Sequence, residues 1–241
     1  EYVYTIKKIG SHLRPVLIKR KGSDYHDKGI AYNKEHSSAT ALRKYLSLHS
    51  ELNGLESSLM PSSIEIIKNS KPLFADDFRG SISRKLYDLL YNDVDLSIYS
   101  DISPSLSDRI YKLNKNYSDY ETMVASIKSK DYTFTRISRA LCHILLNIKK
   151  SDTDIYKNNI KYSKLLGFRK SSGHLLKLIK TRSKLINITK PADAKDILRD
   201  EKETYRLFMS EVYASYIYNS VYYDKYKTEL KNSYSREIVI V

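Results

Sequence analysis

The sequence predicts a mainly α protein, in which a C-terminal helical domain follows the helix–strand–helix tail of an α/β unit. Two observations predict this arrangement. Beyond Asn53, apolar residues recur at the three-to-four spacing of amphipathic helices. Near the start, by contrast, the β-rich run PVLIKR (residues 15–20) stands between two helical segments. We therefore expect residues 1–50 to be the end of an α/β domain and residues 51–241 to be a helical domain.

The expected α/β tail begins with a helix over residues 2–9. Gly10 closes this helix, because glycine is favoured just past a helix end. The strand over residues 15–20 leads into a polar loop, and a second helix runs over residues 38–49. The chain starts within an amphipathic pattern and without Met, so we expect it to be the C-terminal piece of a longer protein.

In the expected helical domain, each helix is predicted by an apolar face. Pro61 opens a short helix, since proline is favoured at the first helical position. Residues 133–149 form the most regular helix, a further helix covers residues 172–182, and another helical stretch follows Pro191. Residues 185–189 are a candidate strand. The apolar faces of three more helices consist of Phe78, Ile82, Leu86 and Leu89; Leu106, Ile110 and Leu113; and Met123, Val124 and Ile127.

The composition favours a polyanionic partner. Lys and Arg number 42 against 28 Asp and Glu, which gives a formal net charge of +14. Such an excess favours nucleic acid or an anionic membrane surface. The single cysteine, Cys142, excludes a disulfide framework within the chain, and we expect it to be buried as a small hydrophobe. No apolar run reaches the roughly 18 residues of a membrane span and no signal peptide is visible, so we expect a cytoplasmic protein without membrane association.

The start of the second helix carries side chains suited to phosphate. A helix N-terminus exposes unpaired N–H groups and a partial positive charge. Ser37 or Ser38 can cap this end, Thr40 lies in its first turn, and Arg43 follows on the same face. The hydroxyls and the guanidinium could converge on one anion. The plainer alternative is a serine cap followed by a solvated arginine.

The loop RKGSDYHD follows the predicted strand, at the edge of an α/β sheet where ligands bind. Arg20 could contact a nucleotide phosphate, while Tyr25, His26 and Asp27 could orient the loop. A metal site at His26 and Asp27 is disfavoured, because the six histidines are scattered and no ligand spacing recurs. A purely structural loop is the alternative.

The helix predicted over residues 133–149 has two faces. At about 100° per residue, its apolar residues centre on one direction, and a basic stripe centres roughly 140° away. No acidic residue interrupts the stripe, so it is a candidate for contact with a phosphate backbone. The alternative is an ordinary solvated face. The stripe consists of Arg136, Arg139, His143, Asn147 and Lys150.

The segment KYSKLLGFRKSSGHLLKLIKTRSK also suits a polyanion. Gly167 and Gly173 flank a turn that opens a basic helix, and glycine lets backbone N–H groups approach a phosphate closely. Phe168 or Tyr162, if exposed, could stack on an unpaired base. The alternative is a helix–turn–helix corner with Phe168 in the core. The surrounding cations are Lys161, Lys164, Arg169, Lys170, Lys177, Lys180, Arg182 and Lys184.

Three segments, in this order, resemble one family. DYHD followed by HSSATALRK, then YTFTRISRALCHILL, then YSKLLGFRKSSGHLL are similar to the C-terminal half of tRNA(Met) cytidine acetate ligase. This bacterial enzyme belongs to the HxGH-type nucleotidylyl-transferase superfamily, which has a Rossmann-like ATP domain. The resemblance covers residues 2–194. Its YTxTRxxR block is fairly specific, whereas the wider superfamily shares the SSxTxxR element.

The resemblance implies an activity. The family activates acetate with ATP to acetyl-adenylate and then acetylates N4 of the wobble cytidine of elongator tRNA(Met). It implies ATP, accompanied by Mg²⁺, as the cofactor. The residues that match the family's ATP-binding elements are Arg20, Lys21, Ser37, Ser38, Thr40 and Arg43. The residues expected to bind tRNA are Arg136, Arg139, His143, Lys150, Lys164, Arg169 and Lys170.

The chain also departs from the family pattern. The HxGH segment is absent, His36 replaces a residue that is usually aliphatic, and Lys21 replaces one that is often apolar. We therefore expect this chain by itself to be inactive. No protease, metalloprotease or P-loop signature suggests an independent catalytic centre. Two alternatives stay open: a basic helical module that binds RNA without catalysis, and a nucleotidylyl-transferase with another substrate.

Overall fold

In the computed structural model of the chain, the described residues are 1–19, 30, 37–49, 52, 54–56, 59–158 and 161–241. Their contacts divide the chain into two compact units, Glu1–Pro72 and Leu73–Val241. The functional boundary that we expect near residue 50 stays a prediction. None of the helices formed by these residues combines the length and the apolar character needed to cross a membrane.

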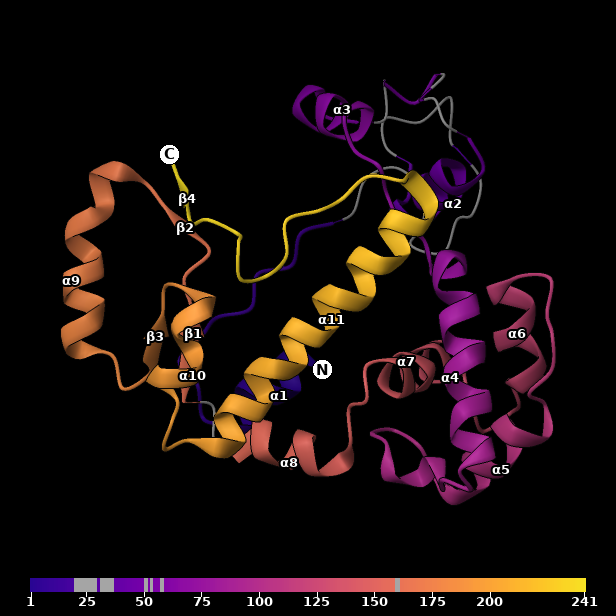
Figure 1. Cartoon of the computed structure of the whole chain (residues 1–241). Coiled ribbons are helices and arrows are strands. Elements are labelled where there is room, and N and C mark those ends of the chain that lie inside the picture. Colours follow the sequence, from indigo (N-terminus) through magenta and orange to yellow (C-terminus); the bar gives the residue numbers. More distant parts are fainter. Residues whose placement is uncertain (20–29, 31–36, 50–51, 53, 57–58, 159–160) are drawn as a thin grey trace. The chain divides into compact units, whose positions relative to one another are not determined.

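The first unit contains the helices α1 (Tyr2–Lys8), α2 (Ala39–Leu48) and α3 (Pro61–Lys68) (Figure 1). All three were predicted. Gly10 adopts a positive φ of 61° just past α1, a conformation that glycine takes without steric cost. Pro61 occupies the first turn of α3, where its missing N–H has no helical partner to lose.

The strand predicted over residues 15–20 is not formed in the described residues, and this part of the prediction is wrong. Residues 11–19 have no regular secondary structure. The side chains of Val16, Leu17 and Ile18 are 82%, 93% and 91% exposed. A strand needs a neighbouring strand to bind its N–H and C=O groups. The described residues of Glu1–Pro72 contain no strand that could serve as this neighbour.

The second unit is built mostly of helices, with two small sheets (Figure 1). Its α-helices are α4 (Arg79–Tyr91), α5 (Pro104–Lys112), α6 (Tyr120–Ile127), α7 (Phe134–Leu145), α8 (Lys150–Asn158), α9 (Gly173–Arg182), α10 (Ala194–Ile197) and α11 (Lys202–Tyr226). Its 3₁₀ helices are η2 (Ala75–Phe78), η3 (Leu96–Ile98), η4 (Lys170–Ser172) and η5 (Pro191–Asp193). Its strands are β1 (Tyr162–Lys164), β2 (Gly167–Phe168), β3 (Ile186–Ile188) and β4 (Val239–Ile240).

One core of this unit is made by the predicted apolar faces. Helix α4 packs on α7, and α6 packs on α7 as well. Ser103 and Asp119 cap α5 and α6 through their side chains, as is usual for these residue types. The cluster consists of hydrophobic side chains, and their burial from water stabilises the fold. Its buried members from the predicted faces include Ile82, Leu86, Leu89, Leu106, Ile110, Met123, Val124 and Ile127.

A second core lies where β3, α10 and α11 meet, and it contains Ile188, Leu198, Phe208 and Val212. Strand β3 pairs in parallel with β1, and β2 pairs in parallel with β4. The candidate strand at residues 185–189 is therefore confirmed, whereas β1, β2 and β4 were not predicted. Helix α11 joins the two cores, because its residue Ile217 packs against the first cluster.

The helix predicted over residues 133–149 is shorter than expected. Helix α7 ends at Leu145, and Asn147 adopts a positive φ of 56°, which asparagine tolerates better than most residues. The chain then turns, and α8 begins at Lys150. Cys142 is exposed rather than buried, so that prediction is wrong. At 100° per residue, Cys142 lies nearly opposite the buried Ile144 and Ile137 face.

Candidate nucleotide and RNA sites

The N-terminus of α2 separates its four candidate phosphate ligands into two pairs. Ser38 is the cap: its Oγ accepts a hydrogen bond from the backbone N–H of Ala41 at 3.0 Å. Ser37 and Ser38 are both buried. Thr40 and Arg43 are exposed and lie one turn apart on the same face. The serine cap is therefore confirmed, and Thr40 and Arg43 are the side chains that face solvent.

The other candidate ATP ligands, Arg20 and Lys21, lie outside the described residues, as do Tyr25, His26 and Asp27. In the part of the chain that the structure describes, no group of three or more His, Cys, Asp or Glu side chains could hold a metal ion.

The basic stripe of α7 has a carboxylate beside it that its own sequence does not contain. Arg139 Nε donates to Asp101 Oδ2 at 2.6 Å, and His143 Nδ1 lies 3.6 Å from the same oxygen. His143 Nδ1 is also 3.0 Å from the carbonyl oxygen of Ser100. The guanidinium of Arg136 instead lies over the ring of Tyr132, 5.1 Å from its centroid. Arg136 and Arg139 therefore both lie on α7 as predicted, but the carboxylate of Asp101 offsets part of their positive charge.

The C-terminal part of the predicted stripe is not on α7. Asn147 and Lys150 follow the end of the helix, and Asn147 Oδ1 accepts a hydrogen bond from the hydroxyl of Tyr99 at 3.3 Å. The structure therefore brings Arg136, Arg139 and His143 together on one helix and places Lys150 at the start of α8. The assignment of one continuous stripe was wrong, because it assumed a helix that continues to residue 149.

The most cationic region of the second unit is the segment that forms β1, β2, α9 and β3. No Asp or Glu occurs between Asp154 and Asp193. Helix α9 has no buried residue, so its cations lie on a solvated element. Of the cations in this segment, Lys161 is bound to an acid, Glu201, at 2.7 Å. The cations are Lys157, Lys161, Lys164, Arg169, Lys170, Lys177, Lys180, Arg182, Lys184 and Lys190.

Gly167 has a structural role that the sequence did not predict. Gly167 lies in β2, where an added Cβ would come within 2.6 Å of the carbonyl oxygen of Val239 in β4. The absence of a side chain therefore permits strand pairing. The N–H of Lys170 donates to the Val241 carbonyl at 2.6 Å, so that group is already bound. Phe168 is half-buried in β2, which agrees with neither a free stacking ring nor a core residue.

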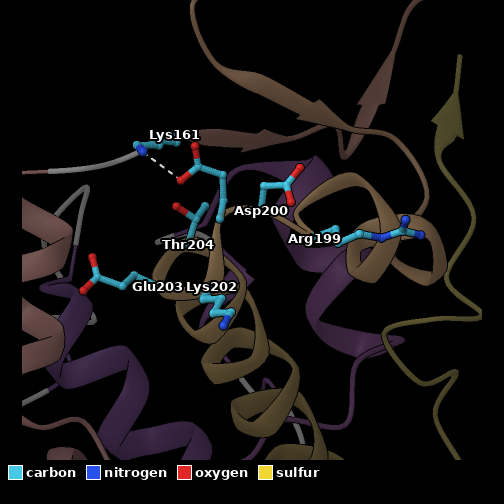
Figure 2. Close-up of a pocket in the computed structure, with 7 residues that line it drawn as sticks. Lys161, Arg199, Asp200, Lys202, Glu203 and Thr204 are labelled. Carbon is cyan, nitrogen blue, oxygen red and sulfur yellow. Dashed lines mark hydrogen bonds and ion pairs between the residues drawn. The ribbon is translucent and has the colours of Figure 1, made fainter.

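Figure 2 shows a cavity of about 400 Å³ at the start of α11. Two of its lining residues, Lys161 and Glu201, form an ion pair at 2.7 Å. Three cations and three carboxylates line the cavity, so it has no single sign of charge. It therefore does not favour a polyanion. The lining residues are Lys161, Arg199, Asp200, Glu201, Lys202, Glu203 and Thr204.

A smaller cavity of about 120 Å³ lies between α8, β1 and α11. It contains one predicted RNA-binding residue, Lys164. Its other polar side chains include Glu211 and Tyr162, whose hydroxyl donates to a Glu211 carboxylate oxygen. The sequence did not indicate a role for Glu211, because Glu211 is 49 residues from its partner Tyr162 along the chain. It did not indicate a role for Asp101 for the same reason, since Asp101 is 38 residues from Arg139.

Comparison with known proteins identifies the family. The model of the family described as HIGH Nucleotidyl Transferase matches residues 1–233 of the chain. The chain belongs to the HIGH nucleotidyl transferase family. It is 34% identical over 229 residues to the tRNA(Met) cytidine acetate ligase of Thermoanaerobacter sp. (strain X514), covering 92% of this chain and 54% of that protein. It is also 34% identical over 203 residues to the Clostridium kluyveri (strain NBRC 12016) protein of the same name. That match covers 83% of this chain and 49% of the Clostridium kluyveri protein.

Solved structures show the same fold for this member of the HIGH nucleotidyl transferase family. Thermotoga maritima TmcAL in its apo form has a TM-score of 0.81 at 20% identity, over 100% of this chain and 58% of that one. The same protein bound with alpha-thio ATP has a TM-score of 0.78, again at 20% identity. The chain spans about half the length of the curated relatives that it matches.

Proposed function

We propose that the chain is the C-terminal part of an ATP-dependent tRNA(Met) cytidine acetate ligase. It supplies the tRNA-binding region and part of the ATP site of the longer protein. The observation that carries this proposal is the 34% identity to proteins of that name over 92% of the chain. The family model, which covers both units, and the fold shared with TmcAL agree with it.

In the proposed reaction, a carboxylate oxygen of acetate attacks the α-phosphorus of ATP, and pyrophosphate leaves. The N4 amine of the wobble cytidine of elongator tRNA(Met) then attacks the carbonyl carbon of the acetyl-adenylate, AMP leaves, and the nitrogen loses a proton. In both steps negative charge develops on phosphate oxygens, where fixed positive groups stabilise it best. Thr40 and Arg43 are exposed at the N-terminus of α2, which supports their proposed role as phosphate contacts. The resemblance adds Arg20 and Lys21 as further proposed ATP contacts. We expect Mg²⁺ to accompany ATP.

The acid-free segment around α9 supports the tRNA part of the proposal. The cations of α9 lie on a solvated helix, in a stretch of sequence without acids, which favours their attraction for a phosphate backbone. Arg136 and Arg139 on α7 form a second cationic pair in the same unit, and His143 lies on the same helix. The proposed tRNA contacts are these residues and Lys150, Lys164, Arg169 and Lys170.

Pyrophosphate exchange in the full-length protein tests the catalytic part. With acetate present, radiolabelled pyrophosphate should be incorporated into ATP, and N4-acetylcytidine should appear in elongator tRNA(Met). Replacing Arg43 with Ala should lower the exchange rate while leaving tRNA affinity within about twofold, because Arg43 lies in the Glu1–Pro72 unit. Exchange with a different acid, or none with any acid, would contradict the acetate ligase.

Charge reversal tests the RNA part in this chain by itself. We expect the triple variant R136E/R139E/R169E to bind tRNA more weakly. Its plot of log binding constant against log salt concentration should also be flatter, by about one unit of slope per lost phosphate contact. The control reverses Lys7, Lys8 and Arg14, which changes the net charge equally in the first unit. Equal affinity and equal salt slope in the two triple variants would exclude α7 and the α9 segment as the interface.

A further inference from the structure

The cavity of about 400 Å³ at the start of α11 is bounded by a helix N-terminus that lacks a cap (Figure 2). Helix α11 has 25 residues, and its N-cap residue makes no capping hydrogen bond through its side chain. The N–H of Tyr205 donates to the Glu201 carbonyl at 2.8 Å. The N–H groups of Lys202, Glu203 and Thr204 come before it, and they bind no acceptor in the part of the chain that the structure describes. These lining residues therefore present unpaired donors and the partial positive charge of the helix end.

A buried hydroxyl gives a second, independent indication of a ligand. Thr204 is 2% exposed and lines the cavity, where Figure 2 draws its side chain. Its hydroxyl makes no hydrogen bond with any residue that the structure describes. Buried polar side chains nearly always have a partner, because an unpaired one costs free energy. A ligand in the cavity can supply the partner that the described residues do not.

The charged side chains that line the cavity leave both signs available to a ligand. Lys161 and Glu201 bind each other at 2.7 Å and so offset each other's charge. Asp200, Glu203 and Lys202 form no ion pair with a described residue. The carboxylates of Asp200 and Glu203 repel a simple anion, while the helix end and the ammonium group of Lys202 repel a simple cation. The lining, and a volume within the range of small-molecule sites, therefore favour a small molecule that carries both charges.

We propose that this cavity binds a small zwitterion of the α-amino acid type. The carboxylate accepts hydrogen bonds from the N–H groups at the start of α11 and from the Thr204 hydroxyl. The ammonium group donates to Asp200, which comes two residues before the helix. Arg199 also lines the cavity, but it is paired with Asp196 at 3.3 Å and takes no part. None of the lining residues is among the proposed ATP and tRNA contacts, so the inference goes beyond the proposed function.

Nuclear magnetic resonance of the 241-residue chain tests this site. Each standard amino acid would be titrated at millimolar concentration, with acetate and ethylammonium as probes that carry one of the two charges each. We expect at least one amino acid to shift the amide signals of Lys202, Glu203 and Thr204 saturably, because its carboxylate binds their N–H groups. That amino acid should bind about tenfold more tightly than either single-charge probe, since a second charge-assisted hydrogen bond adds to the first.

Variants of the lining assign the two ends of the ligand. Thr204→Val removes the hydroxyl at nearly constant shape, so it should weaken the amino acid and acetate alike, by about fivefold. Asp200→Asn should weaken the amino acid by about tenfold and leave acetate no weaker, because acetate has no ammonium group. Asp193→Asn is the matched control, since it makes the same charge change at an exposed residue outside the lining. Equal weakening in Asp193→Asn would overturn the assignment of Asp200.

Several results would overturn the zwitterion site as a whole. One is that no amino acid shifts the three amide signals, and another is that acetate binds as tightly as every amino acid. Unchanged affinity in Asp200→Asn would exclude a bound ammonium group, and unchanged affinity in Thr204→Val would exclude a carboxylate at the hydroxyl. Because Asp200 is exposed, its variant remains informative even where Thr204→Val perturbs the fold.

Discussion

At the scale of single residues, Asp101 controls how the cations of α7 are presented. Its carboxylate lies 2.6 Å from Arg139 and 3.6 Å from His143. Asp101 has a positive φ of 64°, a conformation in which Asp and Asn are much more frequent than other residues with a side chain. The residue therefore has two roles, shaping the turn after η3 and balancing the charge of α7.

Asp101→Asn separates these two roles. Asparagine tolerates the same φ, so the turn should persist while the negative charge is lost. We expect affinity for tRNA to rise by up to about fivefold, the range of an exposed ion pair, and anisotropy titrations at low salt would measure it. Asp196→Asn is the control, because its partner Arg199 lies on neither α7 nor α9. Unchanged or weaker affinity in Asp101→Asn would remove Arg139 and His143 from the interface.

At the scale of elements, the pairing of β2 with β4 attaches the end of the chain to the segment before α9. Val239 N–H donates to the Leu166 carbonyl at 3.1 Å, and Val241 N–H donates to the Phe168 carbonyl at 3.2 Å. The strands can approach this closely because residue 167 is glycine. The acid-free segment is thus held by a contact that is distant in sequence.

Gly167→Ala should disrupt this pairing. The new Cβ would meet a backbone oxygen, and β2 or β4 must then move, at a cost of about 1–3 kcal/mol. Hydrogen exchange at the amides of Val239 and Val241 should accelerate by roughly tenfold or more. Gly173→Ala is the control, since a Cβ there meets nothing within 4 Å and its φ is −56°. Equal protection of the two amides in both variants would contradict this role of Gly167.

At the scale of the whole molecule, the chain consists of two compact units whose proposed roles differ. Glu1–Pro72 carries Thr40 and Arg43, and Leu73–Val241 carries α7, α9 and both cores. Within the second unit, α11 contributes Phe208 and Val212 to one core, and Ile217 packs against the other. Helix α11 therefore connects the two apolar clusters, and we expect them to fold as one unit.

A chain that begins at Leu73 tests this division. Because the second unit has its own cores, it should unfold cooperatively by calorimetry and bind tRNA within about threefold of the whole chain. The same truncation with R136E/R139E/R169E provides the control for specific binding. A truncated chain without a thermal transition would contradict the independence of the unit. A stable one with more than tenfold weaker binding would place tRNA contacts in residues 1–72.

Much of the helical architecture was predictable from the sequence. The apolar faces of α4, α5 and α6 were assigned correctly because a face repeats every three to four residues and needs no distant partner. The cap at Ser38 follows from the same local rules. The strand predicted over residues 15–20 failed because β-propensity is realised only beside another strand.

The candidate sites divide in the same way. The sequence alone was enough to indicate the cations of α7 and α9 and the helix start at α2 that we propose binds phosphate. Charge and position around a helix are local properties that sequence spacing records. Tertiary structure alone brought Asp101 to Arg139, Glu211 to Tyr162, and β4 to Gly167. Each of these contacts joins residues far apart in sequence, and no local pattern records which distant side chain a folded backbone will bring within hydrogen-bonding distance.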